Sequence, residues 1–106
     1  MIHPGLTAEK WQNYSRELQL GNIGAEVLRM INRQNQGEID SAKLSLERVL
    51  ELIDLTVNDP KWPGKQKELL RMREILCARI FAPSEFAIPD EQLIKYFNAF
   101  GILARR

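Results

Sequence analysis

Apolar residues recur every three or four positions along most of the chain, and this spacing predicts helices rather than strands. The clearest pattern runs from Gly37 to Asp59, where the apolar residues fall on one continuous stripe. Gly37 is typical of the left-handed residue that follows a helix, and Pro60 disfavours helical geometry at the residue before it. A central helix is therefore predicted between these residues. Its stripe comprises Ile39, Ala42, Leu46, Val49, Leu50, Ile53 and Val57.

Three leucines of the central helix project away from this stripe. A sizeable apolar patch on a surface is typical of an interface with another protein. The alternative explanation is that a neighbouring helix or the proline-rich loop after the helix covers them. The sequence thus provides a candidate interface, which consists of Leu44, Arg48, Leu52 and Leu55.

The N-terminal third predicts one long helix, which starts after the N-cap Thr7 and runs to about Gln36. Two apolar seams run along it, so it is either covered on two sides or broken where the seams overlap. Gly21 and Gly24 lie at the overlap, and each costs a helix about 1 kcal/mol relative to alanine. Because the pattern resumes in phase after them, we expect both glycines to allow a second backbone to approach closely. The first seam comprises Trp11, Tyr14, Leu18, Gly21, Ala25 and Leu28, and the second Leu20, Gly24, Val27 and Ile31.

Two further helices are predicted, from about Lys65 to Phe81 and from about Asp90 to Ala104. Trp62, which lies between two prolines, is expected to cover the end of the helices. Helices joined by short to moderate loops favour a bundle. We therefore expect an all-α, up-and-down four-helix bundle that begins with a long helical hairpin and forms a single domain over residues 1–106.

Charge links two of the predicted helices. The central helix carries six acidic and two basic residues from Glu38 to Asp59, and the next carries five basic and two acidic residues from Lys65 to Arg79. Arg73 falls inside the apolar stripe of its helix, where an unpaired charge is very costly. We therefore expect the helices to pack antiparallel, with a buried ion pair between Arg73 and Asp54, or with Glu51 in a different register.

The residue inventory argues against several kinds of chemistry. The single histidine, His3, and the single cysteine, Cys77, are too few for zinc or for the di-iron sites of helical bundles. No base is placed beside a nucleophile. No catalytic residue, cofactor or metal site is therefore expected, and the acidic arc of Glu47, Glu51 and Asp54 is more typical of a solvated or salt-bridged face.

Net charge and hydropathy bound the possible partners. The net charge is +1, and the basic residues of the third predicted helix are scattered around it, so nucleic-acid binding is not favoured. No apolar run approaches the roughly 20 residues of a membrane span. The first residues do not form a secretory signal. We therefore expect a cytoplasmic protein that does not bind membranes.

The strings GNIGAEV, LERVLELIDLTVNDPKW, KELLRMREIL and KYF resemble a group of small prokaryotic helical bundles with no established activity. At fold level the pattern is similar to HEPN bundles, some of which are RNases or partners of small nucleotidyltransferases. HEPN RNases carry an arginine followed four to six residues later by a histidine, and no arginine here is followed in this way. The resemblance therefore implies a binding or partner role.

Two hypotheses follow. The first is a non-catalytic helical bundle that acts through protein–protein contacts, as a homodimer or with a small protein partner. The second is a HEPN-like module that acts on RNA or processes nucleotides and needs a second protein to complete its site.

Overall fold

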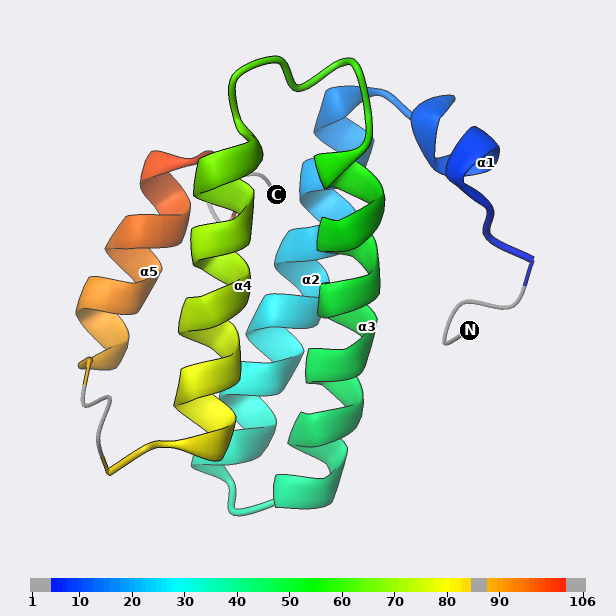
Figure 1. Cartoon of the computed structure of the whole chain (residues 1–106). Coiled ribbons are helices and arrows are strands. Elements are labelled where there is room, and N and C mark those ends of the chain that lie inside the picture. The colour runs from blue at the N-terminus through cyan, green and yellow to red at the C-terminus, as the bar shows by residue number, and fades with distance from the viewer. Residues whose placement is uncertain (1–4, 85–87, 103–106) are drawn as a thin grey trace.

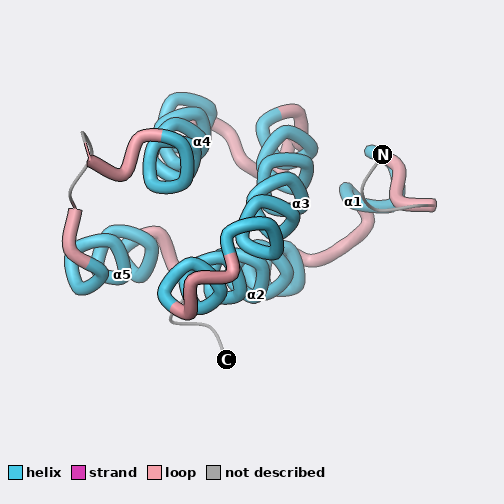
Figure 2. Tube along the Cα trace, turned by 90° about the horizontal axis from the view of Figure 1, so that it is seen from below, coloured by secondary structure: helices cyan, strands magenta, loops and turns pink. Residues whose placement is uncertain are grey.

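The computed structural model describes residues 5–84 and 88–102, and every regular element in these ranges is an α-helix. Five helices follow in order: α1 (Ala8–Gln12), α2 (Arg16–Asn35), α3 (Ile39–Val57), α4 (Gln66–Phe81) and α5 (Asp90–Ala99). The four longer helices lie side by side and alternate in direction (Figure 1). Seen from the end, α1 lies outside this group, on the side of α2 and α3 away from α4 and α5 (Figure 2). The prediction of an all-α chain is confirmed.

The predicted N-terminal helix is interrupted, because two separate capping residues start two helices. The Thr7 hydroxyl accepts a hydrogen bond from the Lys10 N–H at 3.2 Å and starts α1. The Ser15 hydroxyl accepts from the Leu18 N–H at 3.1 Å and starts α2. Such caps satisfy amides that have no partner inside the helix. The cap at Thr7 is as predicted, whereas the single helix to Gln36 is wrong.

The hairpin of α2 and α3 is the most extensively packed pair of helices, followed by α3 with α4. Gly37 joins α2 to α3 with a φ of +80°, a left-handed conformation that glycine adopts without strain. The core lies between these helices and receives Leu93 and Phe97 from α5. Burying a large apolar side chain contributes about 1.5–3 kcal/mol. The core residues that come from α2, α3 and α4 are Ile23, Val27, Met30, Ile31, Ala42, Leu46, Val49, Leu52, Ile53, Leu69, Met72, Leu76 and Ile80.

The inward face of α2 differs from the first predicted seam. Leu18, Ala25 and Leu28 are exposed, so α2 is not covered along both predicted seams. The buried stripe is instead Gln19, Ile23, Glu26 and Met30, with Val27 beside it. This stripe also follows a spacing of four, three and four, but two of its members are polar. A search for apolar residues alone therefore misplaces the first seam, whereas the second predicted seam is buried at Gly24, Val27 and Ile31.

The two glycines of α2 have different surroundings. A Cβ atom at Gly24 would lie 2.6 Å from the carbonyl oxygen of Ile102, whereas a Cβ atom at Gly21 would have nothing within 4 Å. The close approach of a second backbone is therefore present at Gly24 and absent at Gly21. The approaching backbone is the turn after α5 rather than another helix.

That turn exists because α5 ends earlier than predicted. Gly101 has a φ of +91°, and the Ile102 N–H donates to the Phe97 carbonyl at 3.0 Å. This arrangement closes a helix and reverses the chain. The helix thus stops at Ala99 rather than Ala104, and Ile102 packs against α2. Residues 103 and 104 of the predicted helix lie outside the described residues.

A polar cluster ties α2, α4 and α5 together at the end near the α2–α3 turn. The Arg79 guanidinium donates to the Asp90 carboxylate at 2.7 Å, and the Asn35 amide donates to the same carboxylate at 2.9 Å. The Gln34 amide donates to the Arg79 carbonyl, also at 2.9 Å. We call these four residues the arginine cluster.

Candidate functional site

The short helix α1 is attached to the bundle through Trp11. The Trp11 indole is buried and donates to the Thr56 hydroxyl of α3 at 3.0 Å. The Gln19 side-chain amide donates to the Trp11 carbonyl at 2.8 Å. A five-residue helix is marginal by itself. These two hydrogen bonds and the burial of the indole therefore determine where α1 lies.

The same hydrogen bonds extend under the α3–α4 loop. The Gln19 amide also donates to the Asp59 carboxylate at 2.7 Å, and its oxygen accepts from the Trp62 indole at 2.9 Å. Trp62 is buried and stacks on Phe100, so it covers the end of the bundle as predicted. We call Trp11, Gln19, Thr56, Asp59 and Trp62 the tryptophan network.

The buried Asp59 carboxylate is charged in spite of its location. Burial by itself would raise the pKa of Asp59. Hydrogen bonds from the Lys61 backbone N–H, the Gln19 amide and the Lys61 ammonium group outweigh burial, and they hold the pKa below its ordinary value of 3.8. The ammonium group lies 3.0 Å from the carboxylate and also bonds to the Gln12 carbonyl. The network thus joins α1, α2 and the α3–α4 loop.

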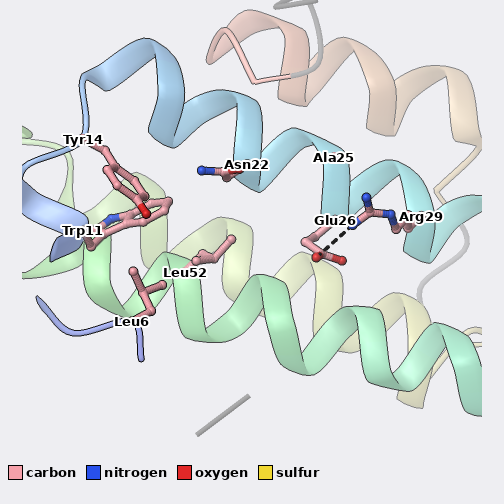
Figure 3. Close-up of a pocket in the computed structure, with 8 residues that line it drawn as sticks. All are labelled: Leu6, Trp11, Tyr14, Asn22, Ala25, Glu26, Arg29 and Leu52. Atoms are coloured by element: carbon pink, nitrogen blue, oxygen red, sulfur yellow. Dashed lines mark hydrogen bonds and ion pairs between the residues drawn. The ribbon is translucent and has the colours of Figure 1, made fainter. Parts of the chain in front are cut away.

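A groove of about 300 Å³ lies between α1 and the α2–α3 hairpin. In Figure 3, the rings of Trp11 and Tyr14 lie at one end of this groove, and the Glu26 carboxylate lies at the other. The Leu52 side chain of α3 lies between them. Apolar walls with a few polar groups are typical of binding sites. The groove is lined by Leu6, Trp11, Tyr14, Asn22, Ala25, Glu26, Arg29 and Leu52.

Three polar side chains that line the groove, Asn22, Glu26 and Arg29, come from α2, whereas the Tyr14 hydroxyl comes from the segment before it. Glu26 is only 8% exposed. One of its oxygens accepts from the Arg29 guanidinium at 3.0 Å, and the other, Oε1, is buried and has no hydrogen-bond partner in the described part of the chain. The Asn22 side chain is half-buried one turn earlier. Because these residues are spaced four and three apart, they form one polar edge along the groove.

The polar groups that line the groove are a carboxylate, an amide, a guanidinium, a phenol and an indole N–H, and none of them is a nucleophile paired with a base. Within residues 5–84 and 88–102, no group of three or more histidine, cysteine, aspartate and glutamate residues could hold a metal ion. No helix in the same ranges is both long and apolar enough to cross a bilayer.

The candidate interface predicted on α3 is not one exposed patch. Leu44 is 48% exposed, but Leu52 is 3% exposed and belongs to the core. Arg48 and Leu55 are half-buried. For Leu52 the interface prediction is wrong and the alternative, that another segment covers it, is correct. The cover is α1 and the residues before it, since Leu6 and Trp11 line the groove beside Leu52.

The predicted ion pair between α3 and α4 is present, but it is not buried. Arg73 donates twice to the Asp54 carboxylate, at 2.8 and 3.2 Å, which makes the contact bidentate. The two side chains are 38% and 52% exposed. The hydrogen bond to Asp54 raises the pKa of Arg73. The pair lies at the margin of the α3–α4 contact, so water reaches both charges.

The remaining residues singled out from the sequence do not gather into a site. Glu47 is exposed and Glu51 is half-buried on α3. Cys77 is half-buried on α4 with a free thiol, among the side chains packed against the core. His3 lies outside the described residues.

Sequence reasoning missed Gln19, Asn22 and Glu26. Gln19 and Glu26 lie on the same helical stripe as Ile23 and Met30, and a polar residue on a buried stripe is a signal for a hydrogen-bond network or a site. Asn22 carries no such signal, because it lies at the margin of that stripe.

Comparisons with protein-family models, with curated proteins and with solved structures gave no match. The function of this chain is therefore argued from its own geometry.

Proposed function

We propose that this protein is a non-catalytic helical bundle that acts through protein–protein contacts, as a homodimer or as the partner subunit of a small protein. In this proposal α2 to α5 form an up-and-down four-helix bundle, and α1 is an additional segment that shapes a binding surface. The observation that carries the proposal is the exposed apolar face of α2.

This face, which we call the α2 face, follows a spacing of three, four and three along one helix. Leu18 and Leu28 are 49% and 38% exposed, and Ala25 between them is exposed as well. Open space lies over Gly21, since nothing is within 4 Å of its Cβ position. Single exposed apolar residues are ordinary, whereas a contiguous patch is typical of an interface. The α2 face comprises Leu18, Gly21, Ala25 and Leu28.

The α2 face continues into the groove. Ala25 belongs to both, and Asn22 and Arg29 of the groove come from the same helix. A partner that packs on the α2 face therefore also meets the polar edge of the groove. An apolar centre with a polar margin is the usual composition of a protein interface.

Light scattering coupled to size exclusion tests this proposal. We expect the native chain to be a dimer, and Leu28→Glu to be a folded monomer because it places a charge within the α2 face. Leu70→Glu is the matched control, since Leu70 is a similarly exposed leucine on α4. If the two variants have the same mass at every concentration, the α2 face is not the dimer interface. A native monomer would leave only the role of partner subunit.

The RNA-acting module is the second candidate, and one feature favours it. The Arg16 guanidinium lies 4.6 Å from the centre of the Trp62 ring, and the Lys65 ammonium group lies 5.9 Å from the centre of the Phe100 ring. These residues line a hollow of about 360 Å³. Cations beside aromatic rings are typical of sites for single-stranded nucleic acid.

Binding of a short single-stranded RNA tests this candidate. Affinity should fall steeply with salt, because released counterions drive such binding. Arg16→Ala should weaken it, while Arg71→Ala, a change of an exposed arginine away from the hollow, should have little effect. Absence of binding at low salt removes this candidate.

A further inference from the structure

We propose that the groove between α1 and the α2–α3 hairpin receives a lysine or arginine side chain of the partner protein, with the Glu26 carboxylate as its acceptor. This inference rests on the proposed function, because it specifies one side chain that the partner contributes. Four features support it: a buried carboxylate oxygen that has no donor, an arginine that is only weakly bound to that carboxylate, apolar walls, and an aromatic ring at the opposite end of the groove.

The first feature is Oε1 of Glu26. A carboxylate accepts several hydrogen bonds, and buried polar atoms in folded proteins almost always have a partner. Among the described residues, Oε1 of Glu26 is the one buried side-chain nitrogen or oxygen atom that has no hydrogen-bond partner. Leaving such an atom unpaired destabilises the fold. A donor supplied from outside the chain removes this cost, and a cationic donor forms the strongest bond to a carboxylate.

The second feature is the weak hold of Arg29 on Glu26. Arg29 lies one turn after Glu26 on the same helix and donates a single hydrogen bond to its carboxylate, with a distance of 3.0 Å between the two atoms. The Arg29 side chain is 53% exposed. Because the cation of this pair lies mostly in water and the pair spans one helical turn, the hold of Arg29 on Glu26 is weak. An incoming cation can therefore join Arg29 at the carboxylate or displace it into solvent.

The third feature is the composition of the walls. Leu6, Trp11 and Leu52 give the groove an apolar lining, which suits the methylene stem of a lysine or arginine. A volume of about 300 Å³ is at the small end for ligand sites and fits one side chain better than a folded element. The charged end of a long side chain can then reach the carboxylate at the far end (Figure 3).

The fourth feature is the Tyr14 ring. It is half-buried and meets the Trp11 ring edge to face, with ring centres 5.6 Å apart. Because this ring lies at the end of the groove opposite Glu26, it can pack against the methylene stem of the incoming side chain rather than its charge. An acidic group would instead be repelled by Glu26, although it could bind the exposed Arg29. A neutral hydroxyl could donate to Oε1, but without the contribution of a positive charge.

Three small probes of similar size separate these occupants: n-butylammonium, 1-butanol and butyrate. We would titrate each into the ¹⁵N-labelled protein and follow the Glu26 backbone amide and the Trp11 indole by NMR. We expect n-butylammonium to cause saturable shifts of both signals, with an affinity about tenfold above that of 1-butanol. Equal affinities for the two, or tighter binding of butyrate, would overturn the proposal.

Two variants examine the role of the carboxylate. Glu26→Gln should remove the preference for n-butylammonium and keep the affinity for 1-butanol. Arg29→Gln should increase the affinity for n-butylammonium, since it removes the competing guanidinium. A purely structural Glu26–Arg29 pair predicts no such gain, so an unchanged or lower affinity in Arg29→Gln contradicts the proposal even if Glu26→Gln fails to fold.

A final comparison separates a protein side chain from a free amine. Nα-acetyl-lysine amide carries the side chain as a protein presents it, and putrescine is a free diamine. Binding of the capped lysine with at least the affinity of putrescine supports a partner protein, whereas binding of putrescine alone overturns it. Because Ala25 belongs to both the α2 face and the groove, the titrations use the Leu28→Glu variant, in which no dimer covers the groove. Their failure is therefore distinguishable from failure of the light-scattering test.

Discussion

The two ends of the bundle are both held by polar side chains, but in different environments. In the tryptophan network, Gln19 is completely buried and Asp59 is 1% exposed. In the arginine cluster, Asp90 has a side chain that is 42% exposed and Asn35 is at the surface. Each end joins residues that are distant in the sequence. The ends therefore differ less in the number of hydrogen bonds than in their access to water.

This difference determines what the loss of a partner costs. A buried group that loses its hydrogen bond stays unsatisfied, whereas an exposed group is solvated again. The tryptophan network should therefore behave as one unit in which every member is required. The arginine cluster should tolerate the loss of single members.

The largest expected effect compares two glutamines. Gln19→Ala removes the partner of the Trp62 indole and one partner of Asp59, and it leaves a cavity, so it should lower the free energy of unfolding by about 3–5 kcal/mol. Gln34→Ala in the arginine cluster should cost only about 1 kcal/mol. Urea denaturation followed by circular dichroism measures both. Equal losses in the free energy of unfolding would mean that the difference in access to water does not affect the stability of the two ends.

The next prediction compares an enclosed and an open position that carry no polar side chain, namely the two glycines of α2. Gly24→Ala places a methyl group against the Ile102 carbonyl and should destabilise by about 1–3 kcal/mol through overpacking. Gly21→Ala has open space and should stabilise by about 0.5–1 kcal/mol, since alanine favours helices. Thermal melting of both variants provides the measurement. A loss of stability in Gly21→Ala would contradict the open surroundings of that glycine.

A smaller effect depends on pH. Hydrogen bonds from Asn35 and Arg79 hold the pKa of Asp90 below 3.8, as the contacts of Asp59 do for that residue. A carboxylate with a lowered folded-state pKa stabilises the fold above its unfolded pKa, and this contribution is lost as the pH falls through the folded value. The native chain should therefore lose stability below about pH 4.

Two variants, in which an asparagine replaces an aspartate, show how much each end of the bundle contributes to the loss of stability at low pH. Compared with the native chain, Asp59→Asn and Asp90→Asn should each reduce the difference in urea midpoint between about pH 7 and about pH 3. The reduction should be larger for Asp90→Asn, because hydrogen bonds are the main influence on the pKa of Asp90, whereas burial opposes the hydrogen bonds that lower the pKa of Asp59. A larger reduction for Asp59→Asn would mean that its enclosed hydrogen bonds outweigh burial by more than the exposed ones do.

The smallest expected effect concerns the pair between α3 and α4, which belongs to neither end. Arg73→Ala should cost about 0.2–1 kcal/mol, because both charges of the pair are exposed. The loss should become smaller in high salt. If urea denaturation showed that Arg73→Ala lowers the free energy of unfolding by several kcal/mol, the pair would contribute as much as a buried one does.

The helix content and the partner of Arg73 followed from the sequence, because each depends on local spacing and on charge. The Gly37 turn and the position of Trp62 over the bundle end also followed, since glycine and proline restrict the backbone locally. The break at Ser15 did not, because the apolar spacing continues across it and conceals a second cap.

The burial of Leu52 could not be read from one helix. Leu52 projects away from the predicted stripe, but α3 packs against α1, α2 and α4, so the buried arc of α3 is wider than that stripe. Gln19 and Glu26 were missed for other reasons. The partners of Gln19 come from other segments, so spacing along α2 does not reveal them. Glu26 is polar, so a search for apolar residues passes over its buried position.

The placement of the tryptophans has a consequence for spectroscopy. The chain has two tryptophans, and both indoles belong to the tryptophan network. Intrinsic fluorescence therefore reports on one end of the molecule and is silent about the arginine cluster. If α5 separates from the bundle at the arginine cluster first, circular dichroism will change before the emission does. A difference between the two signals would then mark an order of events rather than an artefact.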